Sequence, residues 1–149
     1  MSIVVARTFT VAAAAPAVIG YLIDFGHTPN WDPAMRRAIR HDTGPVVVGS
    51  RWHTETKVLG VSADLAYTLA DAGPDRLVFV GHGEAATSAT TLTARPVDGG
   101  TEVTYHVDLE MHGVAKLATP VMRIEFEKLG TEAAARLTAV LNRLPYPAT

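Results

Sequence analysis

Four side chains in this sequence have the chemistry for proton transfer in an apolar cavity: Tyr67, Tyr105, His82 and Glu125. A phenol that faces such a cavity must find a hydrogen-bond partner, and a carbonyl group of a ligand can be that partner. The same contact would polarise an enolisable ketone. A partner within the protein, such as Ser88, Thr90 or Glu125, is the equally weighted alternative.

His82 lies between Gly81 and Gly83, where a β-bulge would turn its imidazole inward to act as a general base. The alternation with Val78 and Val80 leaves its direction open. A histidine on the protein surface is the simpler interpretation and the one that we favour.

Two charged residues lie on or beside the apolar faces of predicted elements. Glu125 lies at the edge of the apolar arc of a predicted helix, and a carboxylate at a cavity wall would have a raised pKa. A salt bridge to Lys128 is the alternative for Glu125. Arg7 is in phase with an apolar strand face and could enter the cavity, but we favour an arginine that extends to solvent.

A second group of residues has the size or adaptability to contact a hydrophobic ligand. For most of its aromatic and methionine members, simple core packing is the stronger expectation. Trp31 is the exception, because prolines bracket it in a short segment. The predicted ligand-binding residues are Trp31, Trp52, Phe79, Ser88, Thr90, Met111 and Met122.

The residue periodicity predicts which elements hold these side chains. Apolar residues alternate from Ile3 to Val11, which indicates a strand, and residues 14–25 follow a helical period. A short helical piece follows near Pro29 and Pro33. Turn residues at strand-length intervals between residues 35 and 111 predict six more strands. After Gly113 a long amphipathic helix begins, in which Pro120 causes either a kink or a lead-in turn.

The order of these elements limits the architecture. Strands joined by short turns must be antiparallel, and the few helical segments cannot cover both faces of a seven-stranded sheet. We therefore predict an α+β fold in which the sheet curves around the long C-terminal helix and encloses an apolar cavity. Residues 1–149 form one domain in this prediction.

Composition excludes several classes of function. The sequence has no cysteine, which excludes a disulfide scaffold, a thiolate metal site and a cysteine nucleophile. Its 13 basic and 15 acidic residues nearly balance, so the protein has no positive electrostatic field that would attract the phosphates of a nucleic acid. The histidines show no metal-binding spacing, and no nucleotide-binding motif is present, so we expect neither a metal nor a cofactor. No segment is apolar for long enough to span a membrane, and we expect a cytoplasmic protein.

Seven short motifs stand out along the chain: residues 7–11, 15–16 with 18, 21–22 with 24, 31–33, 44–45 with 49–52, 74–77, and 99–101 with 103–105. They resemble motifs of the START-like (SRPBCC, helix-grip) superfamily, which includes polyketide cyclase/dehydrase and Bet v 1-like proteins. The resemblance implies a cavity between the sheet and the long helix, with Trp31 near its mouth. Small residues on one strand would enlarge this cavity: Ala86, Ser88, Thr90, Leu92 and Ala94.

Three functions remain open at this stage. The first is a polyketide cyclase/aromatase-like enzyme that promotes enolisation, aldol cyclisation or dehydration. The second is a non-catalytic carrier of a small hydrophobic ligand such as a lipid or quinone. The third is a protein-interaction or toxin-like role, which needs an exposed apolar patch that the strand alternation does not display. An ionisable group with a perturbed pKa in the cavity would favour the enzyme. We expect a monomer or a homodimer.

Overall fold

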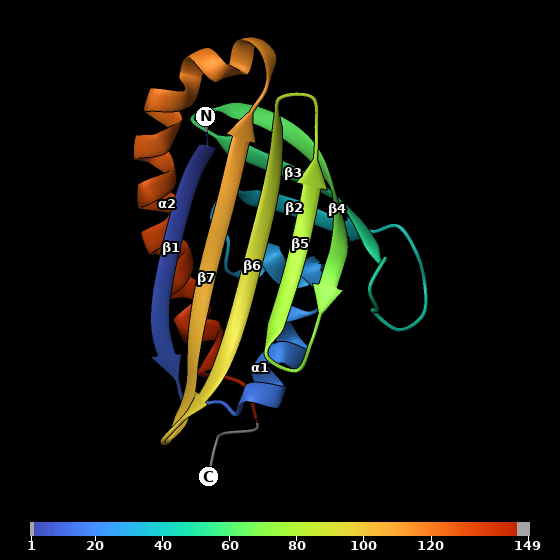
Figure 1. The fold of residues 1–149 in the computed structure, drawn as a ribbon, viewed down its shortest axis with the longest axis vertical. Coiled ribbons are helices and arrows are strands. Elements are labelled where there is room, and N and C mark those ends of the chain that lie inside the picture. Colours follow the sequence, from blue (N-terminus) through green and yellow to red (C-terminus); the bar gives the residue numbers. More distant parts are fainter. Residues whose placement is uncertain (1, 146–149) are drawn as a thin grey trace.

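The computed structural model describes residues 2–145, which form a curved antiparallel sheet with helices on its concave side (Figure 1). The seven strands are β1 (Ser2–Val11), β2 (Met35–Arg40), β3 (Arg51–Val58), β4 (Val61–Ala72), β5 (Arg76–His82), β6 (Ala86–Val97) and β7 (Gly100–Met111). Their order across the sheet is β1-β7-β6-β5-β4-β3-β2. The helical segments are α1 (Ala15–Leu22), η1 (Phe25–Asn30), η2 (Gly113–Ala118) and α2 (Thr119–Leu141). The predicted α+β helix-grip fold is confirmed.

Side-chain alternation gives the sheet its two faces. In β7, Asp108 and Glu110 are exposed on the convex face. Because successive side chains of a strand point to opposite faces, the intervening residues meet the helices instead. These buried residues of β7 are Val103, Tyr105, Val107, Leu109 and Met111.

The first helical region differs in its boundaries from the prediction. The helix expected over residues 14–25 ends at Leu22. A new 3-10 helix then begins because Asp24 caps it: Oδ1 of Asp24 accepts a hydrogen bond of 2.9 Å from the backbone N–H of Gly26. This 3-10 helix ends at Asn30, so Trp31 and Pro33 lie after the short helix rather than within it.

For the C-terminal helix, the lead-in turn is the correct alternative. The 3-10 helix η2 comes first, and α2 then begins at Thr119 with Pro120 in its first turn, where the missing N–H has no helical partner to lose. The helix ends at Leu141, before Pro145. Pro147, which was also expected to terminate it, lies outside the described residues.

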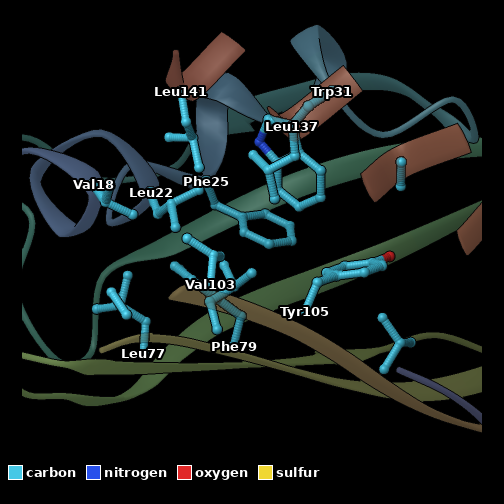
Figure 2. Packing of buried hydrophobic residues seen from close by; sticks show 14 of the residues in the cluster. Val18, Leu22, Phe25, Trp31, Leu77, Phe79, Val103, Tyr105, Leu137 and Leu141 are labelled. Atoms are coloured by element: carbon cyan, nitrogen blue, oxygen red, sulfur yellow. The ribbon is translucent and has the colours of Figure 1, made fainter. Parts of the chain in front are cut away.

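The buried side chains form two clusters. The larger cluster fills the concave side between α1, η1, the sheet and the C-terminal half of α2, where Leu137 and Leu141 are buried (Figure 2). The smaller cluster includes Ile3 and Leu109, against which Met122 and Phe126 of α2 pack. Between Thr119 and Gly130, no side chain of α2 is fully buried. The two halves of this helix are therefore anchored to very different degrees.

No helix within residues 2–145 is both long enough and apolar enough to cross a membrane.

Candidate functional site

A cavity of about 70 Å³ lies between the concave face of the sheet and the middle of α2. Its walls are mainly aliphatic, and three ionisable side chains reach it: Asp32, Tyr67 and Tyr105. The other lining residues are Val5, Ala34, Met35, Thr56, Val58, Leu65, Ser88, Thr90, Val107, Leu109, Phe126, Leu129 and Gly130.

Asp32 follows Trp31 in the segment that joins η1 to β2. Its Oδ1 accepts a hydrogen bond of 2.9 Å from the backbone N–H of Ala34, which fixes the carboxyl group. Burial raises the pKa of Asp32 from 3.8 to about 6, although backbone hydrogen bonds and the charge of Arg136 act in the opposite direction. Asp32 is therefore a carboxyl group that exchanges its proton near neutral pH.

Tyr105 is a buried phenol on β7. Burial is the main reason that its pKa lies well above 10, and the charges of Asp32 and Tyr67 raise it further. The ring of Trp31 meets the Tyr105 ring edge-on at 5.6 Å between centroids. In Figure 2 the hydroxyl of Tyr105 points away from Phe25 and the tightly packed side chains around it. Tyr105 is thus a neutral hydrogen-bond donor at physiological pH.

Tyr67 is the second buried phenol, on β4. Burial raises its pKa to about 12, the charge of Asp32 adds to this, and the Ser88 side chain lowers it. Its ring lies over Gly81 of β5, where an added Cβ atom would come within 2.7–2.8 Å of the ring. Gly81 therefore provides the space that the Tyr67 ring occupies.

The charge of Asp32 acts on the pKa of both phenols. One proton acceptor and two proton donors thus border a small, mainly apolar space. This arrangement can remove a proton from a carbon atom beside a carbonyl group while a phenol holds the carbonyl oxygen.

Sequence reasoning missed Asp32. Its position between Trp31 and Pro33 was used to limit a helix and as part of a motif that carries the family resemblance, without a role for its side chain. An aspartate whose side chain bonds the backbone N–H two residues later is a common turn former, and that signal was available. The sequence contained no signal that this turn directs the carboxyl group into the cavity.

Of the predicted site residues, four line the cavity: Tyr67, Tyr105, Ser88 and Thr90.

Three predicted aromatic ligand contacts are instead part of the larger core. Trp52 and Phe79 are fully buried, their ring centroids are 5.7 Å apart, and Trp52 Nε1 donates a hydrogen bond of 3.3 Å to Asp24 Oδ1. Trp31 is only 2% exposed, so the expectation that it lies at the cavity mouth is wrong. Its ring packs edge-on against the Tyr105 ring inside the core.

The two methionines belong to the smaller hydrophobic cluster. Met111 is buried beside Leu109, and Met122 packs against the same cluster from α2. Neither lines the cavity, and the α2 residues that do are Phe126, Leu129 and Gly130.

His82 is exposed on the convex face of the sheet. It pairs in regular register with Ala66 and Thr87, and the irregularity between β4 and β5 lies at Leu69 and Asp71. The bulge that would have turned His82 inward is therefore absent at this position. The surface histidine that we favoured is the correct alternative, and His82 does not line the cavity as a base.

Glu125 and Arg7 also differ from expectation. Glu125 is partly buried on α2 but does not line the cavity, and within residues 2–145 it forms no salt bridge with Lys128. Arg7 does not line the cavity, and its side chain, which is 26% exposed, lies along α2 instead of extending freely into solvent. Its guanidinium donates hydrogen bonds to the backbone oxygen and carboxylate of Glu127, at 2.9 and 3.0 Å, and to Thr131. Arg7 therefore fastens α2 to β1.

The cavity is smaller than the inward small residues of β6 suggested. Ser88 and Thr90 do open space beside the tyrosines, but Phe25, Trp52 and Phe79 fill the rest of the concave side. Pockets for drug-sized ligands usually measure about 300–1,000 Å³. In this conformation only a compact group fits.

A second hollow is an open surface groove of about 620 Å³ between α1 and residues Leu144 and Pro145. It is larger, but among residues 2–145 the titratable side chains that line it are Tyr21 and His27, which stack on each other at 4.3 Å between ring centroids. Residues 2–145 contain no cluster of three potential metal ligands. The internal cavity is therefore the candidate site, because its ionisable groups are buried together.

Comparison with solved structures places the fold among known proteins. The Zhui aromatase/cyclase from Streptomyces sp. R1128 superposes with a TM-score of 0.79 at 15% identity, covering 96% of this chain and 95% of that one. A START superfamily protein from Mycobacterium smegmatis gives 0.68 at 17% identity, with 93% and 94% covered. The di-domain ARO/CYC BexL of the BE-7585A biosynthetic pathway gives 0.70 at 10% identity, covering 97% of this chain and 51% of BexL.

A comparison with curated protein sequences found no match. The profile of a protein family described as "Polyketide cyclase / dehydrase and lipid transport" matches residues 2–142, which is nearly the whole chain. The chain therefore belongs to this family.

Proposed function

We propose that the protein is a cyclase- or dehydrase-type enzyme that acts on an enolisable carbonyl compound in the internal cavity. The observation that carries this proposal is the meeting of Asp32, Tyr67 and Tyr105 in one small apolar cavity. A hydrophobic carrier needs only the cavity, whereas a carboxyl group in the cavity with a pKa near 6 favours an enzyme.

In the proposed reaction, the Asp32 carboxylate removes a proton from the carbon atom beside the carbonyl group. Tyr105 donates a hydrogen bond to the carbonyl oxygen, which carries the negative charge of the enolate, and Tyr67 supports the same oxygen or a second carbonyl group. The enolate carbon then attacks another carbonyl carbon of the same molecule, and the new alkoxide takes back the proton from Asp32. In a dehydration, the protonated Asp32 instead gives its proton to the departing hydroxyl group.

The size of the cavity limits the substrate. With about 70 Å³ available, the cavity holds the reacting carbonyl group and its immediate neighbours rather than a long chain. Confinement of this kind brings the reacting carbon atoms together, which is itself a large contribution to catalysis. The aromatase/cyclase names of two structural neighbours support a polyketone as the substrate class.

A non-catalytic carrier of lipids or quinones is the second candidate. It is favoured by the aliphatic lining from Val5, Leu65, Val107 and Leu129, which needs no reaction to explain it. The family description also names lipid transport.

Deuterium exchange separates these two functions. Cyclopentanone, a compact enolisable ketone, is incubated with the protein in deuterated water, and loss of its α-proton signal is followed by NMR. We expect the wild-type protein to accelerate exchange and Asp32→Asn to lose about 100-fold or more of that acceleration. Asp108→Asn is the matched control, because it makes the same change at an exposed carboxylate on the convex face.

Equal exchange by the wild-type protein and Asp32→Asn would overturn the enzyme proposal. If mass spectrometry of the purified protein then detected a retained hydrophobic molecule, the carrier would be the supported function. Circular dichroism establishes that each variant is folded before the rates are compared.

A further inference from the structure

One end of the molecule carries a row of exposed aliphatic side chains. Val114 and Leu117 on η2 are 88% and 85% exposed, and Val121 and Ile124 on α2 are 59% and 64% exposed. Spacings of three, four and three residues place them along one side of the continuous helical segment. The core residues Ala133 and Leu137 lie on the opposite side of α2 by the same helical period.

The turn between β3 and β4 adds two more exposed aliphatic residues, Leu59 and Val61. Figure 1 shows this turn and η2 at the same end of the molecule. We call these six residues the apolar end: Leu59, Val61, Val114, Leu117, Val121 and Ile124. Isolated exposed aliphatic residues are common on proteins, but a group of this size at one end marks a binding surface.

The apolar end adjoins the cavity through its neighbours in the chain. Val58, which precedes Leu59, lines the cavity, and so does Phe126, which follows Ile124 by two residues. The β3–β4 turn and the N-terminal part of α2 therefore both border this part of the cavity, and both carry exposed aliphatic side chains. Whatever covers the apolar end also faces the space between β3 and α2.

The segment of residues 112–124 is net positive, and the nearest carboxylates in the chain are Glu110 before it and the partly buried Glu125 after it. From residue 112 to residue 124 the chain includes Lys116 and Arg123, both exposed, and no carboxylate. The whole protein has a net charge of −2, so this segment differs in sign from the rest. Aliphatic side chains flanked by lysine and arginine are the pattern of a helix that lies on an anionic lipid surface.

We propose that the apolar end docks on the surface of an anionic lipid bilayer. The aliphatic side chains enter the boundary between headgroups and acyl chains, while Lys116 and Arg123 contact lipid phosphates. A hydrophobic molecule then passes between the bilayer and the cavity without crossing water. This docking goes beyond the proposed reaction and does not depend on it.

Two observations favour lipid over a protein partner. The row has only aliphatic side chains and lacks the tryptophan and tyrosine anchors that dominate protein interfaces. A second copy is disfavoured by charge, because pairing two such rows would bring Lys116 and Arg123 of each copy together without a carboxylate between residues 112 and 124 to balance them.

Vesicle sedimentation tests the proposal. The protein is mixed with vesicles of equal parts phosphatidylcholine and phosphatidylglycerol, or of phosphatidylcholine alone. We expect stronger binding to the anionic vesicles and a loss of about tenfold or more in the double variant Leu117→Glu/Ile124→Glu. Val47→Glu/Val48→Glu is the matched control: these residues are 58% and 56% exposed, in the loop before β3 and away from the apolar end, and should bind like wild type.

A second double variant measures how much the two positive charges contribute to vesicle binding. Lys116→Ala/Arg123→Ala should reduce binding to anionic vesicles and remove its salt dependence, while weak binding to neutral vesicles is kept. All substituted residues are exposed, and thermal unfolding confirms that the variants fold.

Three results would overturn the proposal. The wild-type protein could fail to sediment with anionic vesicles, or both glutamate double variants could lose binding to the same extent. The third is a wild-type dimer in light scattering that Leu117→Glu/Ile124→Glu dissociates, which would show that a second copy covers the apolar end.

Discussion

At the scale of single residues, the partial burial of Asp32 in the cavity wall costs folding free energy. Its pKa rises from 3.8 to about 6, so the ionised carboxylate destabilises the folded state near neutral pH. A rise of this size corresponds to roughly 3 kcal/mol, which is a large share of the stability of a small domain. A carboxyl group that is kept at such a cost usually has a chemical role.

The sign of this effect gives a testable pH dependence. Between pH 3.8 and about 6 the folded protein holds a proton on Asp32 that the unfolded chain has released, so this group lowers stability as the pH rises. Asp32→Asn, which can still accept the Ala34 hydrogen bond, should be more stable than wild type at pH 7, by up to about 3 kcal/mol. The gain should vanish towards pH 4.

Urea unfolding at several pH values measures this difference. The control is Asp108→Asn, whose exposed carboxylate should leave the pH profile unchanged. A variant that is equally destabilised at every pH would instead mean that the Asp32 side chain has a purely structural role.

At the scale of elements, the strands were predictable because their residues alternate. The apolar period of β1 and β7 and the turn residues between strands determine the order of elements. The site was only half predictable for the same reason. Strand alternation places Tyr67, Ser88, Thr90 and Tyr105 on the inner face, but it cannot distinguish a core position from a cavity position.

The remaining site residues depend on contacts between elements that are distant in sequence. Trp31 is buried because it meets Tyr105, which is more than seventy residues away in the chain. Arg7 finds its partners on α2, at Glu127 and Thr131. Asp32 becomes a cavity residue only because η1 ends one residue before Trp31. No local period in the sequence reports such contacts.

The contact between β4 and β5 provides a further prediction. A methyl group at Gly81 would meet the Tyr67 ring at 2.7–2.8 Å, so Gly81→Ala must displace the ring. We expect a loss of about 1–3 kcal/mol in stability. Exchange of cyclopentanone protons should also fall, because the Tyr67 hydroxyl moves away from Asp32.

Gly20→Ala is the control for this change. No atom lies within 4 Å of a Cβ added at Gly20, and the residue is exposed in α1. Because alanine favours helices, this variant should be about 0.5–1 kcal/mol more stable than wild type. Unchanged unfolding and exchange in Gly81→Ala would show that the Tyr67 ring adapts without cost.

At the scale of the whole molecule, α2 is held firmly at its C-terminal half and loosely at its N-terminal half. Ala133, Leu137 and Leu141 are buried in the larger core. The preceding part, from Pro120 to Leu129, has no fully buried side chain and forms one wall of the cavity. Because local opening follows the density of buried contacts, the loose half is where the small cavity can widen.

Hydrogen–deuterium exchange followed by mass spectrometry should resolve the two halves. Backbone amides of residues 120–129 should exchange at least about tenfold faster than those of residues 133–141, because fewer buried contacts must break to expose them. Equal protection along α2 would show that the helix opens as one unit, and the cavity would then have to widen elsewhere.

The close packing between the cavity wall and the adjoining core has a consequence for evolution. In the proposed reaction Asp32, Tyr67 and Tyr105 are the reactive groups, whereas Phe25, Trp52 and Phe79 fill the adjoining space and so determine how much room is left. The Phe25 ring packs against the Tyr67 ring at 4.5 Å between centroids, and Trp52 is the cross-strand partner of Tyr67, so a substitution that enlarges the cavity here also shifts one of the phenols. Within this scaffold, a change in accepted molecular size is therefore coupled to a change in the geometry of the reactive groups.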